Sequence, residues 1–212
     1  MECLFDNIHN VYRDQGCKGF GHSYLLKRAA GNVLLPRMGP ETTIEAEYDA
    51  IKALGGLEII FVTDYHFGGG STEQIAQHFD ARSICSSIEK PKLKKRGLHQ
   101  VEALAYERQF LADDLECIPV PGHTSGGFCL LWTDTAAKYL FTGDFLYFDG
   151  HTWVPGAKTR RKIEASLQLL KDLEYDYLVG CGSDGVSTPH IELRSETEKV
   201  KFIDQILARF KQ

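Results

Sequence analysis

The sequence lacks the features that mark membrane, secreted and nucleic-acid-binding proteins. Among its 212 residues there is no apolar run near the roughly 18 residues needed to cross a membrane. Its first residues carry neither the basic start nor the apolar core of a signal peptide. The net charge is −5, whereas nucleic-acid-binding proteins are usually basic. We therefore expect a protein that binds neither membranes nor nucleic acids.

The six cysteines form no Cys-x-x-Cys pair. They are Cys3, Cys17, Cys85, Cys117, Cys129 and Cys181. Free thiols in a reducing cytoplasm are the simplest interpretation of this pattern.

The chain also lacks a linker rich in Pro, Gly or Ser, and it shows no repeat of fixed period. Its apolar fraction of 43% and charged fraction of 25% are those of an ordinary globular protein. A chain of this length can bury a sizeable core. We expect one domain over residues 1–212.

Hydrophobic periodicity predicts strands in hairpins, interrupted by helices. Strands are predicted at 19–28, 33–36, 57–63, 83–85, 115–120, 127–132, 138–142 and 177–179. Helices are predicted at 41–54, after a cap at Ser71 or Thr72, at 159–173 and at 196–210. These helices need a sheet to cover. Two sheets packed face to face, with helices outside both, would satisfy that need.

Polar side chains of metal-ligand type follow four of the predicted strands. They are Asp64 with His66, His123, Asp144 and Cys181, and glycines surround each of them. Strand ends on one edge of a sheet sandwich converge, so these turns form a candidate metal site. The alternative is that each polar residue only caps its turn and that Cys181 is a small buried residue.

Two segments in the second half carry a resemblance to a known family. The run Pro-Gly-His-Thr-Ser-Gly-Gly at 121–127 and the run Leu-Phe-Thr-Gly-Asp at 140–144 resemble motifs of the metallo-β-lactamase superfamily. The resemblance implies an α/β (α+β) fold, a four-layer αββα sandwich of two mixed β-sheets flanked by helices. It also implies that His123 ligates a first metal and that Asp144 bridges two metals.

The family's main signature, Thr-His-x-His-x-Asp-His-x-Gly-Gly, is only partly present. Here Thr63 is followed by Asp-Tyr-His-Phe-Gly-Gly at 64–69. Without a gap, Asp64 takes the first His position, His66 takes the second, and glycines replace the Asp and the last His. With a two-residue contraction, His66 and the glycines match His-x-Gly-Gly, Tyr65 replaces the Asp, and the first His pair is missing. Both registers stay open.

The departures change what the site could hold. The family's last ligand is the His of a Gly-His-Gly turn, and Cys181 stands in that place. In the ungapped register Asp64, His66, His123 and Asp144 could hold one ion. In the contracted register His66, Asp144 and Cys181 could cluster, leaving His123 alone. The resemblance therefore implies at most one divalent ion, zinc, iron or manganese, or none. The family's metal-bound Asp, which also positions the attacking hydroxide, is absent in both registers.

Other side chains are expected to line the same pocket. By the resemblance these are His22, Tyr65, Tyr147 and His151. For His22 the alternative is a hydrogen-bonded core histidine.

One basic cluster stands apart from the acidic balance of the chain. It comprises Lys90, Lys92, Lys94, Lys95 and Arg96. It is interpreted as a solvated loop after a strand or, alternatively, as a patch that attracts an anionic ligand toward a nearby cleft.

The sequence leaves two main functional hypotheses. The first is a metal-dependent hydrolase of ester, lactone or thioester bonds, in which one ion activates a water molecule. The second is a metal-free protein whose pocket binds a small ligand or a partner protein, opened by the glycines at 68–70. Oxygen or nitric oxide reduction is disfavoured because the chain has no flavin module and lacks several ligands. A nuclease is disfavoured by the acidic charge and the missing ligands.

Overall fold

The computed structural model describes residues 1–16, 19–37, 44–156, 160–183 and 190–210. By its internal contacts the chain divides into two compact units, Met1–Ala105 (unit 1) and Tyr106–Gln212 (unit 2), and each is described in turn. The expectation of one domain over residues 1–212 stays a prediction.

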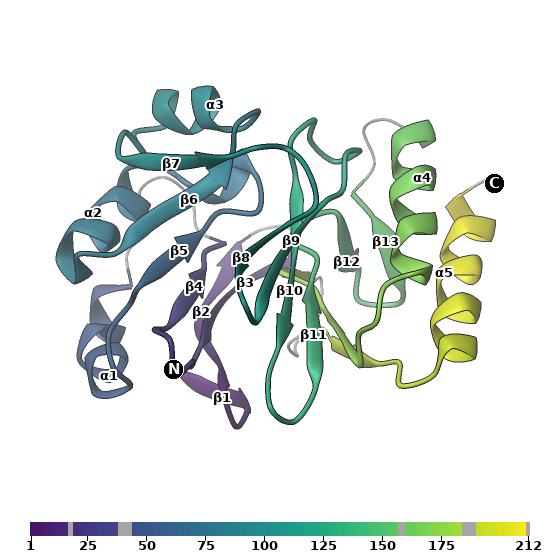
Figure 1. Cartoon of the computed structure of the whole chain (residues 1–212), viewed down its shortest axis with the longest axis horizontal. Coiled ribbons are helices and arrows are strands. Elements are labelled where there is room, and N and C mark those ends of the chain that lie inside the picture. Colours follow the sequence, from purple (N-terminus) through teal and green to yellow (C-terminus); the bar gives the residue numbers. More distant parts are fainter. Residues whose placement is uncertain (17–18, 38–43, 157–159, 184–189, 211–212) are drawn as a thin grey trace. The chain divides into compact units, whose positions relative to one another are not determined.

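Unit 1 contains a mixed β-sheet with helices against it (Figure 1). Its strands are β1 (Glu2–Phe5), β2 (Ile8–Gly16), β3 (Gly19–Leu26), β4 (Val33–Leu35), β5 (Ile59–Phe61), β6 (Arg82–Ser86) and β7 (Val101–Leu104). Pairing is antiparallel from β1 to β4 and parallel from β4 to β7. The helical segments are η1 (Glu45–Glu47), α1 (Tyr48–Ala53), η2 (Tyr65–Phe67), α2 (Gly70–Phe79) and α3 (Lys90–Lys95).

The core of unit 1 lies between this sheet and its α-helices. Strand β5 is buried along its whole length, which the continuous apolar run at 57–63 predicted. Ile51 of α1, Ile75 of α2 and Leu93 of α3 belong to one buried cluster with Ile60 of β5. The turn that follows β5 is therefore attached to the buried, parallel part of the sheet.

Two helix predictions in unit 1 need correction. Within the predicted helix at 41–54, residues 45–47 form a 3₁₀ turn and the α-helix covers only 48–53; residues 41–43 lie outside the described part. Helix α2 begins after Gly69, and Ser71 and Thr72 lie buried inside its first turn instead of capping it. Gly69 is the N-cap residue of α2 and makes no side-chain cap hydrogen bond.

The basic cluster at 90–96 is a helix rather than the predicted loop. Pro91 stands in the first turn of α3, where its missing N–H costs nothing, and Leu93 is fully buried. The lysines at 92, 94 and 95 are exposed. One buried leucine thus anchors a short helix whose other faces are basic.

Unit 2 contains a second mixed sheet in the order β16-β14-β11-β10-β9-β8. Its strands are β8 (Gln109–Ala112), β9 (Leu115–Pro119), β10 (Phe128–Thr133), β11 (Lys138–Phe141), β14 (Tyr177–Val179) and β16 (His190–Glu192). Only the β11–β14 pair in this sheet is parallel. A hairpin outside this second sheet joins β12 (Leu146–Phe148) and β13 (Trp153–Pro155), and β15 (Gly182–Ser183) pairs with β12.

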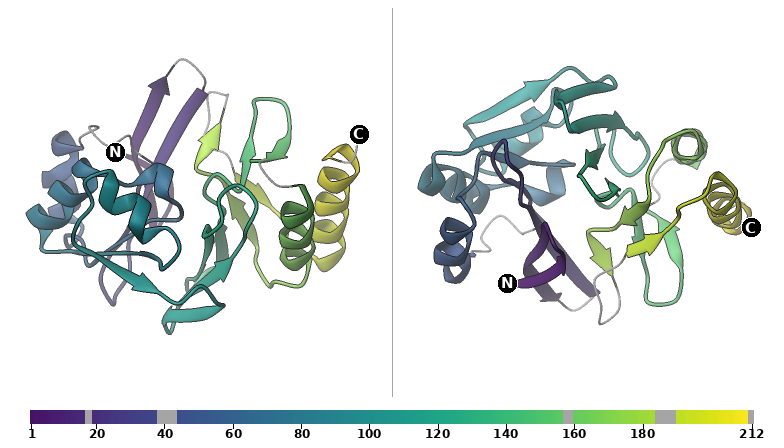
Figure 2. Two further views of the ribbon diagram at one scale, coloured as in Figure 1. Left: turned by 90° about the horizontal axis from the view of Figure 1, so that it is seen from above. Right: turned by 60° about the horizontal axis from the view of Figure 1, so that its bottom comes forward.

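Two helices pack side by side in unit 2 and cover its core (Figure 2). They are α4 (Arg160–Lys171) and α5 (Glu196–Phe210). Ile163 and Leu167 of α4 and Ile203 and Ile206 of α5 share one buried cluster with sheet residues such as Leu140. No helix in the described part of the chain is long and apolar enough to cross a membrane.

Candidate functional site

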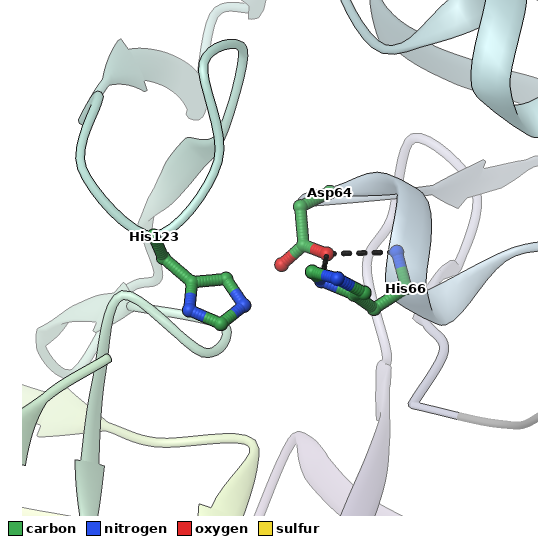
Figure 3. A group of neighbouring side chains, drawn as sticks. All are labelled: Asp64, His66 and His123. Atoms are coloured by element: carbon green, nitrogen blue, oxygen red, sulfur yellow. Dashed lines mark hydrogen bonds and ion pairs between the residues drawn. The ribbon is translucent and has the colours of Figure 1, made fainter. Parts of the chain in front are cut away.

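The turn after β5 brings Asp64 and His66 together. Asp64 is the N-cap of η2, and its Oδ1 accepts the backbone N–H of His66 at 2.8 Å. The same oxygen lies 2.8 Å from Nδ1 of the His66 ring, and Figure 3 shows both bonds converging on it. The Asp64 side chain is 5% exposed and that of His66 is 30% exposed. This pair is therefore a local unit that the turn itself builds.

The Asp64–His66 bond fixes which nitrogen of His66 can bind a metal. An ionised carboxylate only accepts hydrogen bonds, so Nδ1 carries the proton and Nε2 keeps its lone pair. A carboxylate on the far nitrogen is the usual way in which a metal-ligating histidine is oriented. Asp64 and His66 each offer one ligand atom. The geometry favours Asp64 as the residue that orients His66.

Two residues that flank helix α3 hold the backbone of this turn. The guanidinium of Arg96 donates to the carbonyl oxygens of Gly68, at 3.0 Å, and His66, at 3.2 Å. The Glu89 carboxylate, fully buried, accepts the N–H of Tyr65 at 3.3 Å. Each of these bonds fixes a peptide group of the turn, so His66 is carried on a fixed backbone.

A second set of contacts joins α3 to the side chains of the turn. The ammonium of Lys92 lies 4.1 Å from the centroid of the Tyr65 ring, which is cation–π range. The Tyr65 ring centroid lies 4.0 Å from that of His66. The Tyr65 ring therefore contacts both the Lys92 ammonium and the candidate metal ligand His66.

The glycine at 68 is packed rather than open. A Cβ placed on Gly68 would meet Leu93 Cδ2 at 2.6 Å and Val62 Cγ1 at 3.3 Å, with Leu98 at 3.4 Å behind them. No pocket opens at this position, which corrects that part of the metal-free hypothesis. The space that a side chain would need is filled by the leucine of α3.

In unit 2 the turn after β9 carries His123, and the turn after β11 carries Asp144. His123 Nδ1 lies 3.2 Å from the carbonyl oxygen of Gly156, which can only accept, so Nδ1 is the protonated nitrogen. His123 Nε2 lies 3.8 Å from Oδ2 of Asp144, and both side chains are 17% exposed. That separation is long for a hydrogen bond. Nitrogen and oxygen ligands of one tetrahedral zinc ion lie about 3.4 Å apart, so a small shift of either side chain would let both bind one ion.

Gly156 fits this arrangement closely. A Cβ at this position would lie 2.1 Å from the carbonyl oxygen of Asp144 and 2.6 Å from Nδ1 of His123. Only glycine lets the β13 end approach both residues. No sequence pattern predicted the role of Gly156, because it stands 33 residues after His123 and outside any motif.

Cys181 is joined through its backbone to the turn that carries Asp144. Its N–H donates to the carbonyl of Gly143 at 3.5 Å, and the residue is 1% exposed. Burial raises the pKa of the Cys129 thiol, and the charge of Cys181 raises this pKa further. Cys129 belongs to the core cluster of unit 2.

The remaining predicted residues lie in three different settings. His22 on β3 is fully buried, and its Nδ1 lies 2.9 Å from the amide nitrogen of Asn10, as a hydrogen-bonded core histidine would. Tyr147 lies on β12, partly buried. His151 is exposed at the tip of the β12–β13 hairpin, where its N–H donates to Asp149.

Comparison with known proteins assigns the chain to a family. The sequence profile of the metallo-β-lactamase superfamily matches residues 41–182, which include the turns just described. The chain belongs to the metallo-β-lactamase superfamily. No curated protein matches the sequence.

Solved structures of the same superfamily resemble the whole chain. The subclass B3 metallo-β-lactamase BJP-1 of Bradyrhizobium japonicum is 20% identical, with a TM-score of 0.62 over 99% of this chain and 91% of that one. An archaeal superfamily protein from Sulfolobus tokodaii is 14% identical, with a TM-score of 0.66 over 94% of this chain and 85% of that one. The predicted fold class, two mixed sheets with helices in the metallo-β-lactamase fold, is confirmed.

Proposed function

We propose that the protein is a metal-dependent hydrolase that holds one divalent ion. His66, His123 and Asp144 are its core ligands. Asp64 either orients His66 through Nδ1, in which case Cys181 completes the set, or is itself the fourth ligand. The observation that carries the proposal is the setting of His123, whose Nδ1–H is held by Gly156 while Nε2 stands 3.8 Å from the Asp144 carboxylate.

The donor set fits a divalent transition metal. Imidazole nitrogens and carboxylate oxygens suit zinc, iron and manganese, and Asp64, His66 and His123 each offer one such atom. In both histidines the nitrogen that carries the proton is fixed by an acceptor, so the other nitrogen keeps its lone pair. Such acceptors typically contribute ten- to a hundredfold in metal affinity.

The chain's own residues have separate tasks in this proposal. When bound, the ion lowers the pKa of a coordinated water to about 7 and so supplies hydroxide. Asp64 keeps the proton on Nδ1 of His66, and the Gly156 carbonyl keeps the proton on Nδ1 of His123. The carboxylate of Asp144 balances positive charge. Because the family's hydroxide-positioning Asp is absent, we expect slow turnover of activated esters, lactones or thioesters.

A small-molecule ligand is part of the same proposal. The metallo-β-lactamase SMB-1, 16% identical with a TM-score of 0.64, is described in complex with mercaptoacetic acid. Mercaptoacetate is therefore a suitable inhibitor to try against this protein, since thiolates bind zinc well.

The test is elemental analysis of the full chain purified without a metal-binding tag. We expect about one zinc, iron or manganese per chain, lost in His123→Ala and Asp144→Ala. His78→Ala on α2 is the matched control, because this exposed histidine stacks on Tyr48 and belongs to no candidate ligand pair. Metal-loaded protein should hydrolyse 4-nitrophenyl acetate, and mercaptoacetate should slow that reaction.

The opposite result has a definite meaning. If the protein binds none of the three ions after incubation with each, the metal-dependent proposal is wrong. The chain is then the metal-free binding module, and its melting temperature should not change with saturating zinc, iron or manganese.

A further inference from the structure

We propose that α3 gives this site a preference for substrates with an anionic group, a carboxylate or phosphate, and that Lys92 contacts that group. The inference rests on the proposed hydrolase function for its substrate, and it names the substrate class. It comes from contacts within unit 1 alone.

The net charge around α3 is positive, whereas that of the whole chain is negative. Residues 89–96 contain five basic side chains and one acidic side chain, whereas the whole chain has a net charge of −5. The acid, Glu89, is fully buried and its carboxylate accepts the N–H of Tyr65. The solvent-facing surface of α3 is therefore positive, next to the turn that carries Asp64 and His66.

Of the five bases, Lys92 is the one directed toward the candidate ligand. Arg96 is engaged with the carbonyls of His66 and Gly68. Lys90 lies near Glu102 and contributes to the lowered pKa of that carboxyl, after the larger effect of its hydrogen bond to Arg82. Lys94 and Lys95 are exposed.

The distances place the Lys92 charge within reach of the reaction. Its ammonium is 4.1 Å from the Tyr65 centroid, and that centroid is 4.0 Å from the His66 centroid, so Nζ lies at most about 8 Å from the His66 ring. This is about one Debye length at physiological ionic strength, so salt weakens the charge at this distance to about a third of its unscreened effect without abolishing it. An acyl chain of four or five carbons could span from the scissile carbonyl to Lys92.

The ring contact leaves Lys92 able to bind an anion. The face of an aromatic ring attracts a cation without neutralising it. An ammonium has three donors, and a compact point charge suits carboxylate and phosphate oxygens. Tyr65 thus holds the ammonium beside His66 while its charge stays available to a substrate.

The first experiment compares two esters of equal acyl length on the zinc-loaded full chain. These are 4-nitrophenyl pentanoate, which is neutral, and mono-4-nitrophenyl glutarate, which ends in a carboxylate. We expect a higher kcat/KM for the glutarate ester. In Lys92→Met the ratio of the two values should fall about threefold to fivefold, chiefly through KM. Lys92→Arg should restore most of the ratio, and Lys94→Met on the same helix should keep it.

The second experiment does not depend on hydrolysis. Backbone amide chemical shifts of α3 and η2 are followed in metal-free protein during titration with glutarate, and separately with inorganic phosphate. We expect shifts centred on residues 64–68 and 92 in the wild type and in Lys94→Met, and none in Lys92→Met.

The outcomes separate the two proposals. If neither ester is hydrolysed but the anion shifts depend on Lys92, the hydrolase proposal fails and the anion site stands. If both esters are hydrolysed with a ratio that Lys92→Met leaves unchanged, the hydrolase stands and this inference is wrong. Shifts that persist in Lys92→Met also overturn it.

Discussion

Replacing Gly156 with alanine should damage the candidate metal site without touching a candidate ligand. The added Cβ would lie 2.1 Å from the carbonyl oxygen of Asp144 and 2.6 Å from Nδ1 of His123. Carbon contacts are comfortable near 3.5 Å, so β13 or the two turns must move by about 1 Å. The acceptor for the Nδ1 proton of His123 moves with them.

The size of the effect follows from these contacts. Overpacking of this kind costs about 1–3 kcal/mol, less the ~0.4–1 kcal/mol that alanine gains by restricting the unfolded chain. For a chain of this size each kcal/mol lowers the Tm by about 2–4 °C, so we expect a drop of a few degrees. Zinc affinity should fall about tenfold to a hundredfold, since an acceptor that orients a ligand is displaced.

The assay is zinc competition against a chromophoric chelator, with thermal denaturation of the same samples. Gly21→Ala is the control, because its Cβ would meet Nη1 of Arg37, the end of a flexible side chain, instead of backbone. The control should keep wild-type zinc affinity. If Gly156→Ala also keeps it, His123 and Asp144 are not held for a metal in the proposed way.

Three further predictions concern stability and reactivity. Asp64→Ala should lower the unfolding free energy by about 1–3 kcal/mol, because the η2 cap and the bond to His66 are lost. Asp64→Asn should lose less, because it keeps an acceptor. Equal losses of the two variants in thermal denaturation would count against this account. Gly68→Ala should lower the unfolding free energy measured in urea titrations, and this loss should be smaller when Leu93→Ala is also present. Losses that simply add in the double variant would contradict the contact between the two residues. Burial raises the pKa of the Cys117 thiol to about 12, so at pH 8 only about one in 10⁴ of these thiols is ionised. Iodoacetamide should therefore label the exposed Cys3 far sooner than Cys117. Equal labelling rates of the two cysteines in mass spectrometry would refute this.

Regular hydrophobic periodicity correctly predicted elements that pack against a sheet. The helix at 196–210 was predicted with the bounds of α5, because Ile203, Ile206 and Leu207 recur on one face and are buried. The strands predicted at 19–28 and 33–36 and at 127–132 and 138–142 form two antiparallel pairs, β3 with β4 and β10 with β11, as expected of strands in hairpins. Short strands without a regular pattern, such as β12 and β13, were not predicted.

Helix α3 escaped prediction for a physical reason. A six-residue helix with one apolar side chain shows no amphipathic period, so Leu93 alone carried no signal. Its formation depends on tertiary contacts with the turn after β5, through Glu89 and Arg96. Such contacts lie outside any local pattern.

The pattern of strand ends predicted Asp64, His66, His123 and Asp144 as candidate ligands, and their shared role stays a prediction. Within each unit the structure brings Asp64 next to His66 and His123 near Asp144. The role of Asp64 in orienting His66 needed the η2 turn, which brings residues two apart into contact. The full ligand set, including Cys181, stays a prediction, as does a cytoplasmic location.

The packing of Gly68 bears on how the site could change over evolutionary time. In the ungapped register Gly68 stands where relatives have a metal-binding Asp. A side chain there would collide with Leu93, whose Cδ2 lies 2.6 Å from the Cβ position. Gly68→Asp would therefore be harmful until Leu93 had first become smaller, and the smaller residue alone would weaken the core. The two substitutions are epistatic, so an Asp is hard to gain at this position by single mutations.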